Sequence, residues 1–78
     1  MADYVIWGQI MQAGSGGLHT VIVCAVPDDG QASALGVIVR KDTAHSAELA
    51  RVARDRLLVD VRAEVAKHGD TVVRVVEE

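Results

Sequence analysis

The chain has 78 residues, half of them hydrophobic, so we expect one small domain over residues 1–78 rather than a disordered chain. Its formal net charge is −3, no Lys or Arg precedes Arg40, and Tyr4 and Trp7 are its aromatic residues, which argues against nucleic acid as a partner. One cysteine, the absence of a basic secretory leader and the lack of a long apolar run predict a cytoplasmic protein outside the membrane.

Three stretches in the first half have the composition of β-strands. Residues 3–12, 18–26 and 33–41 are rich in aliphatic and aromatic side chains. The glycine-rich loop 13–17 and the turn at residues 27–30 separate them, because glycine and proline favour the backbone angles of turns. Short connections of this kind predict an antiparallel meander of three strands.

The composition changes midway along the chain to residues that favour a helix. Asp42 and Thr43 are both acceptable N-caps, and strong helix formers follow from Ala44. The segment Lys67-His68-Gly69 is typical of a helix end, since it places basic residues in the last turn and glycine just beyond. Residues 70–78 then predict a final strand.

Residues 57–66 are open to two interpretations. Their alternating apolar and polar side chains have the period of a half-buried strand, which would give a terminal hairpin and the order β-β-β-α-β-β. Against this, apolar side chains recur every four residues along one helical flank: Leu49, Ala53, Leu57, Val61 and Val65. We therefore favour one long helix. The predicted fold is α+β in two layers: a three-stranded antiparallel meander, one long helix and a C-terminal strand, β-β-β-α-β.

The first two predicted strands carry apolar side chains on both faces. One helix covers one face of a four-stranded sheet, so the other face would leave an apolar patch of a size that monomers rarely expose. A domain this small is also only marginally stable alone. We therefore predict a homo-oligomer or a protein partner, with Val5, Trp7 and Met11 at the interface. The alternative is a monomer in which strand twist and long side chains cover this face.

A second hypothesis is the binding of a small anionic ligand. Gly14, Gly16 and Gly17 belong to a glycine-rich loop, and Arg51 and Arg54 offer cations on the predicted helix. Such loops hold phosphate where they lead into a helix, through its N-terminal amides. This loop leads into a strand and has no P-loop lysine, so a flexible hairpin tip is the simpler interpretation.

No set of residues makes a convincing catalytic or cofactor site. Cys24 lies in an apolar strand, which disfavours a reactive thiolate, and the three histidines are too scattered for a zinc site. Asp28 and Asp29 could be paired carboxylates for acid–base chemistry, but their place in a turn after proline explains them fully. We therefore predict a non-enzymatic protein with no metal and no cofactor.

The order β-β-β-α-β and the segment His45–Leu49 (HSAEL) resemble the start of ribonuclease-H-like folds, whose first helix opens with Ala-Glu-Leu. That family holds divalent metals with carboxylates, including one within the first strand and one after the fourth. Here Asp3 stands at the very start of the first strand and Glu77-Glu78 end the last, so no catalytic residue is carried over. Shortened versions of the fold occur in HicB-type antitoxins, which gives a third hypothesis, a nucleic-acid-associated regulator of antitoxin type.

Overall fold

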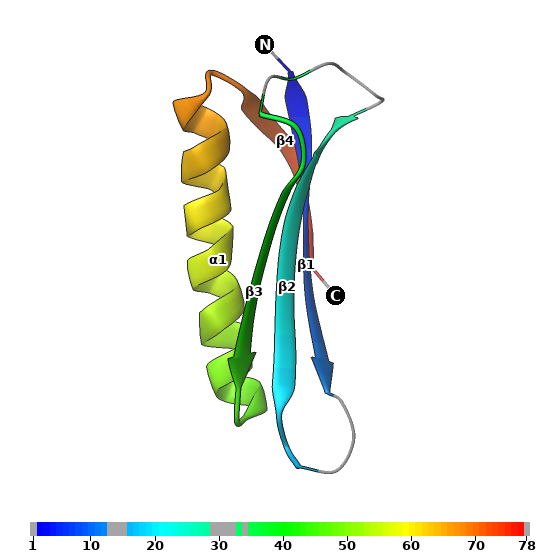
Figure 1. Ribbon diagram of the computed structural model, residues 1–78, viewed down its shortest axis with the longest axis vertical. Helices are drawn as coiled ribbons and strands as arrows, with labels where there is room; N and C mark the ends of the chain where they lie inside the picture. The colour runs from blue at the N-terminus through cyan, green and yellow to red at the C-terminus, as the bar shows by residue number, and fades with distance from the viewer. Residues whose placement is uncertain (1, 13–15, 29–32, 34, 78) are drawn as a thin grey trace.

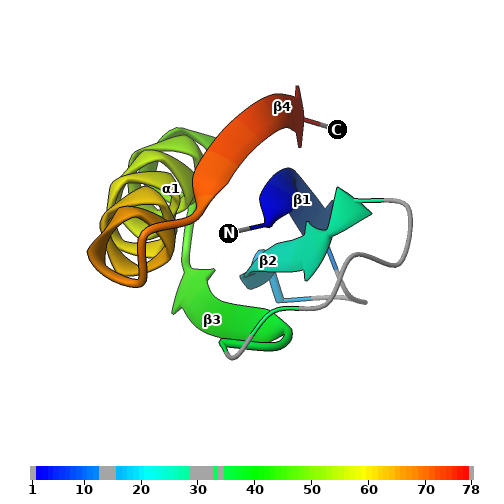
Figure 2. The same ribbon diagram turned by 90° about the horizontal axis from the view of Figure 1, so that it is seen from above.

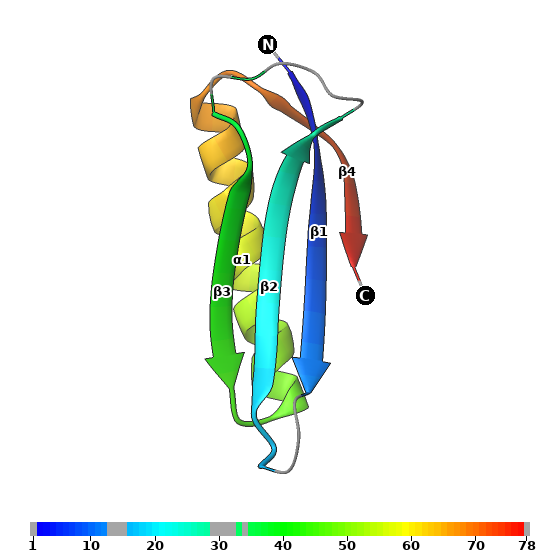
Figure 3. The same cartoon turned by 45° about the vertical axis from the view of Figure 1, so that its right-hand side comes forward.

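The computed structural model describes residues 2–12, 16–28, 33 and 35–77, which form one four-stranded sheet and one helix (Figure 1). The elements follow in the order β1 (Asp3–Gln12), β2 (His19–Pro27), β3 (Ile38–Ala44), α1 (Ala47–Lys67) and β4 (Thr71–Glu77). The spatial order is β3-β2-β1-β4, with β1, β2 and β3 antiparallel and β4 parallel to β1 (Figure 3). The predicted α+β fold and its β-β-β-α-β order are confirmed.

The ambiguous stretch 57–66 is helical, so the order with a terminal hairpin is wrong. In α1 the buried side chains lie on the one flank that faces the sheet: Ala50, Ala53, Leu58, Val61 and Val65. Val59, which would have lain inside in a strand, is 65% exposed. Leu49 is also exposed, because a strict four-residue repeat drifts by about 40° per step around a helix of 3.6 residues per turn.

The helix begins later than its composition predicts. Asp42 and Thr43, the predicted N-caps, both lie in β3. Ser46 is the N-cap instead: it has extended backbone angles, and its hydroxyl accepts a hydrogen bond from the Leu49 amide at 3.1 Å. An N-cap residue stands just before the first helical turn and accepts a hydrogen bond from one of the free amides of that turn. Residues 42 and 43 are paired with β2, so the helix begins only after them.

The third strand begins at Ile38, not at Ser33 as predicted. Ser33 is held by side chains from distant parts of the chain, and Gly36 has a positive φ of 72°, which interrupts extended backbone. The connection from β2 to β3 is therefore longer than the predicted turn. Asp29 and Gly30 of that turn lie outside the described residues.

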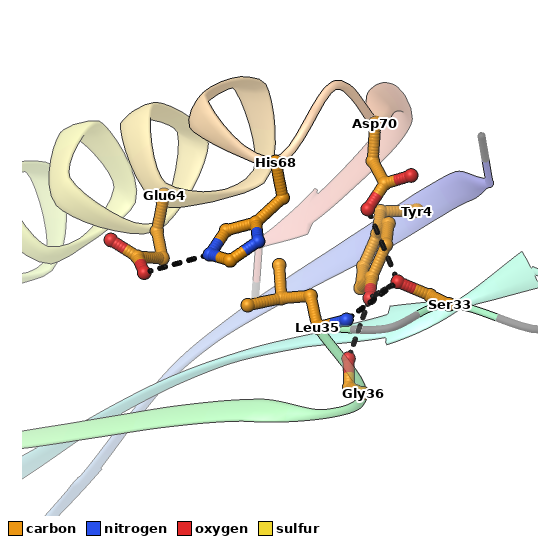
Figure 4. A network of polar contacts seen from close by, with 7 residues as sticks. All are labelled: Tyr4, Ser33, Leu35, Gly36, Glu64, His68 and Asp70. Atoms are coloured by element: carbon orange, nitrogen blue, oxygen red, sulfur yellow. Dashed lines mark hydrogen bonds and ion pairs between the residues drawn. The ribbon is translucent and has the colours of Figure 1, made fainter.

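A polar network joins three ends of the fold around Tyr4, which is fully buried (Figure 4). The Tyr4 hydroxyl donates to the Gly36 carbonyl at 2.6 Å and lies 2.7 Å from Ser33 Oγ. Ser33 Oγ donates to Asp70 Oδ2 at 3.1 Å, and the other Asp70 oxygen accepts from the Ala2 amide at 2.7 Å. The network thus fastens the start of β1, the approach to β3 and the turn before β4 to one another.

The core lies between α1 and the concave side of the sheet. Figure 2 shows the four strands in an arc around the side on which α1 lies. The largest fully buried side chains come from the helix and the two central strands: Tyr4, Ile6, Val21, Val23, Val61 and Val65. A second, smaller cluster near the start of α1 consists of Val21, Ala44, Ala50 and Ala53.

A bulge in the pairing of β1 with β4 decides which β4 side chains enter this core. Tyr4 pairs with Val72 but Val5 pairs with Arg74, so Val73 is the extra residue. Without this bulge, strict alternation would place Arg74 beside Ile6 in the core, where an unpaired charge is very costly. With it, Val72 and Val75 pack against the core and Arg74 lies on the opposite side.

We expect Tyr4→Phe to destabilise the protein by about 1–3 kcal/mol, because it leaves the Gly36 carbonyl without its buried donor. The free energy of unfolding from urea titration measures this loss. Ser33→Ala should cost a similar amount, and the double variant should cost less than the two single losses together, because both residues belong to one network. Additive losses would contradict the network.

Replacing Ser46 with alanine should destabilise the protein by about 1 kcal/mol, since the Leu49 amide loses its acceptor. Ser46→Asp is the matched control, because aspartate also caps helices and favours their positive end. Thermal unfolding followed by helical circular dichroism compares the two variants. Equal losses for Ala and Asp would show that the hydroxyl does not act as a cap.

Candidate interaction surface

The side of the sheet away from α1 has no element over it among the described residues; we call it the open face. Alternation along paired strands fixes which side chains belong to it. Its apolar members are Val5, Trp7 and Met11 of β1, Ile22, Cys24 and Val26 of β2, Val39 of β3 and Val76 of β4. All three residues predicted for an interface thus share one face.

Register arranges these side chains in rows that run across the strands. The central row is apolar on every strand and reads Val39, Cys24, Trp7, Val76 from β3 to β4. Above it, toward the start of β1, Val26 and Val5 lie beside each other. The open face therefore has a continuous apolar centre that crosses the whole width of the sheet.

Exposure along the open face is uneven. Trp7 and Met11 are each 39% exposed and Val39 is 49% exposed, whereas Val5 is only 4% exposed. Val5 lies between Val26 and Arg74 in its row and is buried. Trp7 is thus the large accessible group at the centre, and Val5 contributes little surface of its own.

Polar residues lie at the two edges of the apolar centre and among the side chains below it. Lys41 of β3 and Arg74 of β4 lie on opposite edges, and both are exposed. Below the central row, Gln9 pairs with Ile22, and Met11 pairs with Thr20. An aromatic side chain in an apolar centre with a polar rim is the usual anatomy of a protein–protein interface.

The structure describes four of the five residues of the anion hypothesis. Gly14 lies outside the described residues, and Gly16 is exposed. Gly17 has a positive φ of 67° and lies near the backbone of His45, just before α1; its carbonyl is 2.9 Å from Nδ1 of His19. Arg51 is exposed on α1, one turn from the start of the helix.

Arg54 packs against the sheet and faces two carboxylates. Its stem lies over Gly8, where an added Cβ would be 3.3 Å from Arg54 Cδ. Its guanidinium is 3.7 Å from Glu77 and 3.9 Å from Asp55, and its side chain is 16% exposed. Gly8 thus provides the space in which this long side chain crosses from α1 toward β4.

The groups that could perform other chemistry lie apart. Among the described residues no three His, Cys, Asp or Glu side chains lie close enough together to hold a metal. His68 Nε2 faces Glu64 Oε1 at 3.5 Å, whereas Ser33 Oγ donates to Asp70 (Figure 4). In the described part of the chain no helix has the length and hydropathy needed to cross a bilayer.

A shallow depression runs along the outer side of α1 and was not expected from the sequence. It is lined by Val52, Asp55, Arg56, Val59 and Asp60, with a volume of about 450 Å³. These side chains all project from one helix, so no second wall encloses a ligand. We regard it as ordinary helix surface, because enclosed concave walls are what a ligand pocket requires.

Sequence reasoning missed Val39 and Val76 as members of the open face. Both lie in strands whose register depends on distant pairing and, for Val76, on the bulge at Val73. No protein-family model, curated protein or solved structure matched this chain. The fold and the distribution of its side chains are therefore the grounds on which a function can be argued.

If Arg54 has this structural role, Gly8→Val should destabilise the protein by about 1–3 kcal/mol through overpacking against its stem. In an Arg54→Ala background the same change should cost less, because the space is then free. Urea unfolding of both single variants and the double variant gives the coupling energy. Equal costs of Gly8→Val in the two backgrounds would contradict the contact.

Proposed function

We propose that this protein is a non-enzymatic interaction module that associates, with itself or with another protein, through the open face of its sheet. The observation that carries the proposal is the apolar central row Val39, Cys24, Trp7 and Val76. Two-sided apolar strands are typical of sheets covered on both faces, and α1 covers one.

The energetic reason is the apolar surface left in water. Burial of such surface contributes roughly 25 cal/mol per Å². Trp7 combines a large apolar area with few rotatable bonds, so ordering it at an interface costs little conformational entropy. Trp7 and its neighbours would therefore contribute most of the binding energy for a partner that covers the central row.

The other hypotheses have less support from the described residues. A nucleic-acid-associated regulator would need many cations against phosphates, and the open face carries Lys41 and Arg74. Arg54 would not contribute to an anion site at the glycine loop, because its guanidinium faces Glu77. We place the module in a reducing cytoplasm, without a metal or a cofactor.

A photo-crosslinking residue in place of Met11 should give crosslinked products in cells that express the protein natively. Met11 belongs to the open face and is 39% exposed, so a bound partner would lie within reach. Adding Trp7→Asp should lower the yield at least about tenfold, because binding would then bury an unpaired carboxylate. Immunoblotting for the chain measures the yield and the mass of each product.

The matched control places the same residue at Val59, which is 65% exposed on the outer side of α1. Circular dichroism checks that each variant is folded. Products from position 11 that vanish with Trp7→Asp, at either twice the chain mass or another mass, support the proposal. No product beyond that of the Val59 control would overturn it.

A further inference from the structure

We infer that α1 is a dimerisation surface: the outer side of the helix packs antiparallel against the same side of α1 in a second copy of this chain. The inference concerns a surface other than the open face and goes beyond the proposed function. It follows from the spacing of the exposed apolar side chains along α1, from the depression between them and from the charges beside them.

The outer side of α1 is more apolar than the exposed side of a helix normally is. Figure 2 shows this side turned away from all four strands. Leu49 is 57% exposed, Val52 45% and Val59 65%. A surface helix of a globular protein usually carries charged and polar residues on the side opposite its core. α1 therefore has a second apolar flank besides the one that packs against the sheet.

This second flank has the spacing of a coiled coil. Steps of three and four residues connect six exposed positions, which we call the outer seam: Leu49, Val52, Arg56, Val59, Ala63 and Ala66. They are alternate a and d positions of a heptad that starts at Leu49, and such positions face the partner helix in a coiled coil. Five of the six are apolar. The outer seam thus has the pattern of a helix that packs on another helix.

The shallow depression on α1 belongs to the outer seam. Four of its lining residues stand at positions i, i+3, i+4 and i+7: Val52, Asp55, Arg56 and Val59. Four residues at this spacing form the hole that receives one side chain of a facing helix in coiled-coil packing. A small ligand needs enclosing walls, whereas this packing needs only the surface of one helix. The depression therefore has the residue spacing that a second helix requires.

The charges beside the outer seam match those of an antiparallel copy. Asp55 and Arg62 each stand just before an a position, which makes them g positions on one side of the seam. When the second helix is reversed, side chains on this side meet side chains on the same side of the second copy. Asp55 would therefore lie beside Arg62 of the second copy, and Arg62 beside its Asp55. The two-fold axis forms this ion pair twice.

A parallel copy would bring like charges together instead. In a parallel pair each g residue faces the e residue five positions further along the partner helix. Asp55 would then lie beside Asp60, and Arg62 beside Lys67. Arg56 would also meet Arg56 of the second copy, because equal positions lie opposite each other. All three contacts are repulsive, so the antiparallel arrangement is favoured.

The charges and the length of α1 select the same antiparallel register. When Asp55 lies beside Arg62 of the second copy, residue 48 lies opposite residue 67, so α1 overlaps over nearly its full length. A shift of one heptad brings either Asp55 beside Asp55 or Arg62 beside Arg62, and it also shortens the overlap. Charge pairing depends on the residues beside the seam, and overlap depends on where α1 begins and ends. Their agreement is what a helix that pairs with its own copy requires, and it favours a second copy over a foreign helix.

Arg56 is the charged member of the outer seam. In this register it would lie over Val59 of the second copy, with Asp60 of that copy on the same side of the seam. An arginine stem can cover apolar surface while its guanidinium stays in water. Val59 of the second copy would enter the depression described above. Each cation beside or within the seam therefore has a carboxylate of the other copy near it.

The composition of the seam sets the expected affinity. Two of its members are alanines and one is Arg56, so it buries less apolar surface than a seam of leucine and valine. α1 supplies 21 residues, which is three heptads. We therefore expect a reversible dimer with a dissociation constant of about 10–100 μM.

Charge reversal at the two g positions tests the arrangement. All proteins carry Trp7→Asp, which disables the open face, and native mass spectrometry follows the dimer from about 1 μM to about 1 mM. Asp55→Arg and Arg62→Asp each place like charges together at both contacts, so each should weaken the dimer about tenfold. A mixture of the two variants should form a dimer that contains one of each, because opposite charges then meet at both contacts.

Lys41→Asp is the matched control, since it changes charge as Arg62→Asp does but lies on the open face. It should leave the dimer unchanged, and circular dichroism checks that every variant is folded. A Trp7→Asp chain that stays monomeric at about 1 mM would overturn the inference. A mixture of the two reversed variants that is no more dimeric than either variant alone would overturn it as well.

The two surfaces are read separately in the crosslinking experiment on the open face. Val59 lies in the outer seam, so a product formed there through α1 would have twice the chain mass and would persist with Trp7→Asp. A product formed from Met11 through the open face would be lost with Trp7→Asp. Failure of the α1 dimer therefore leaves the proposed function intact, and failure of the open face leaves the α1 dimer intact.

Discussion

The constraint on which the rest of this structure depends is that β1 and β2 are apolar on both sides while α1 covers one side. Tyr4, Ile6, Val21 and Val23 fill the side toward α1 and are fully buried. Trp7, at the centre of the other side, is 39% exposed. Sheets that are apolar on both sides are common in three-layer and sandwich arrangements, in which both faces are covered. The proposed function follows from this imbalance, since the described residues contain no second layer.

Local composition was sufficient to predict the elements that depend on it. The bounds of β1 agree with the prediction and those of β2 differ by one residue at each end. β4 begins one residue later than predicted, and Glu78, the predicted last residue, lies outside the described residues. The single long helix was also predicted, because no helix breaker interrupts residues 47–67. The alternating pattern in residues 57–66 does not make a strand, because a helix buries Leu58, Val61 and Val65 against the sheet and leaves Val59 in water.

What sequence reasoning missed depends on contacts between distant residues. The start of β3 moved from Ser33 to Ile38 because Ser33 bonds to Tyr4 and Asp70, each about 30 positions or more away along the chain. The helix N-cap moved to Ser46 because β3 pairs through residue 44 with β2. For the candidate surface, β1 supplied all the predicted residues. Val39 and Val76 could not be assigned to it, since a one-residue change in register moves a side chain to the opposite face.

The bulge at Val73 links the core to the open face. It lets Val72 and Val75 both point toward α1 although they are three residues apart in a strand. By the same shift it moves Arg74 to the rim of the open face and aligns Val76 with Trp7. One irregularity therefore excludes a charge from the core and completes an apolar row across all four strands. The core requires this register, since it keeps Arg74 out and Val72 and Val75 in. The same register places Val76 on the open face, so the apolar row depends on the fold as well as on the composition of β1 and β2. A polar open face would therefore need polar side chains in place of Trp7, Val39 and Val76. Each of these three positions carries an apolar residue.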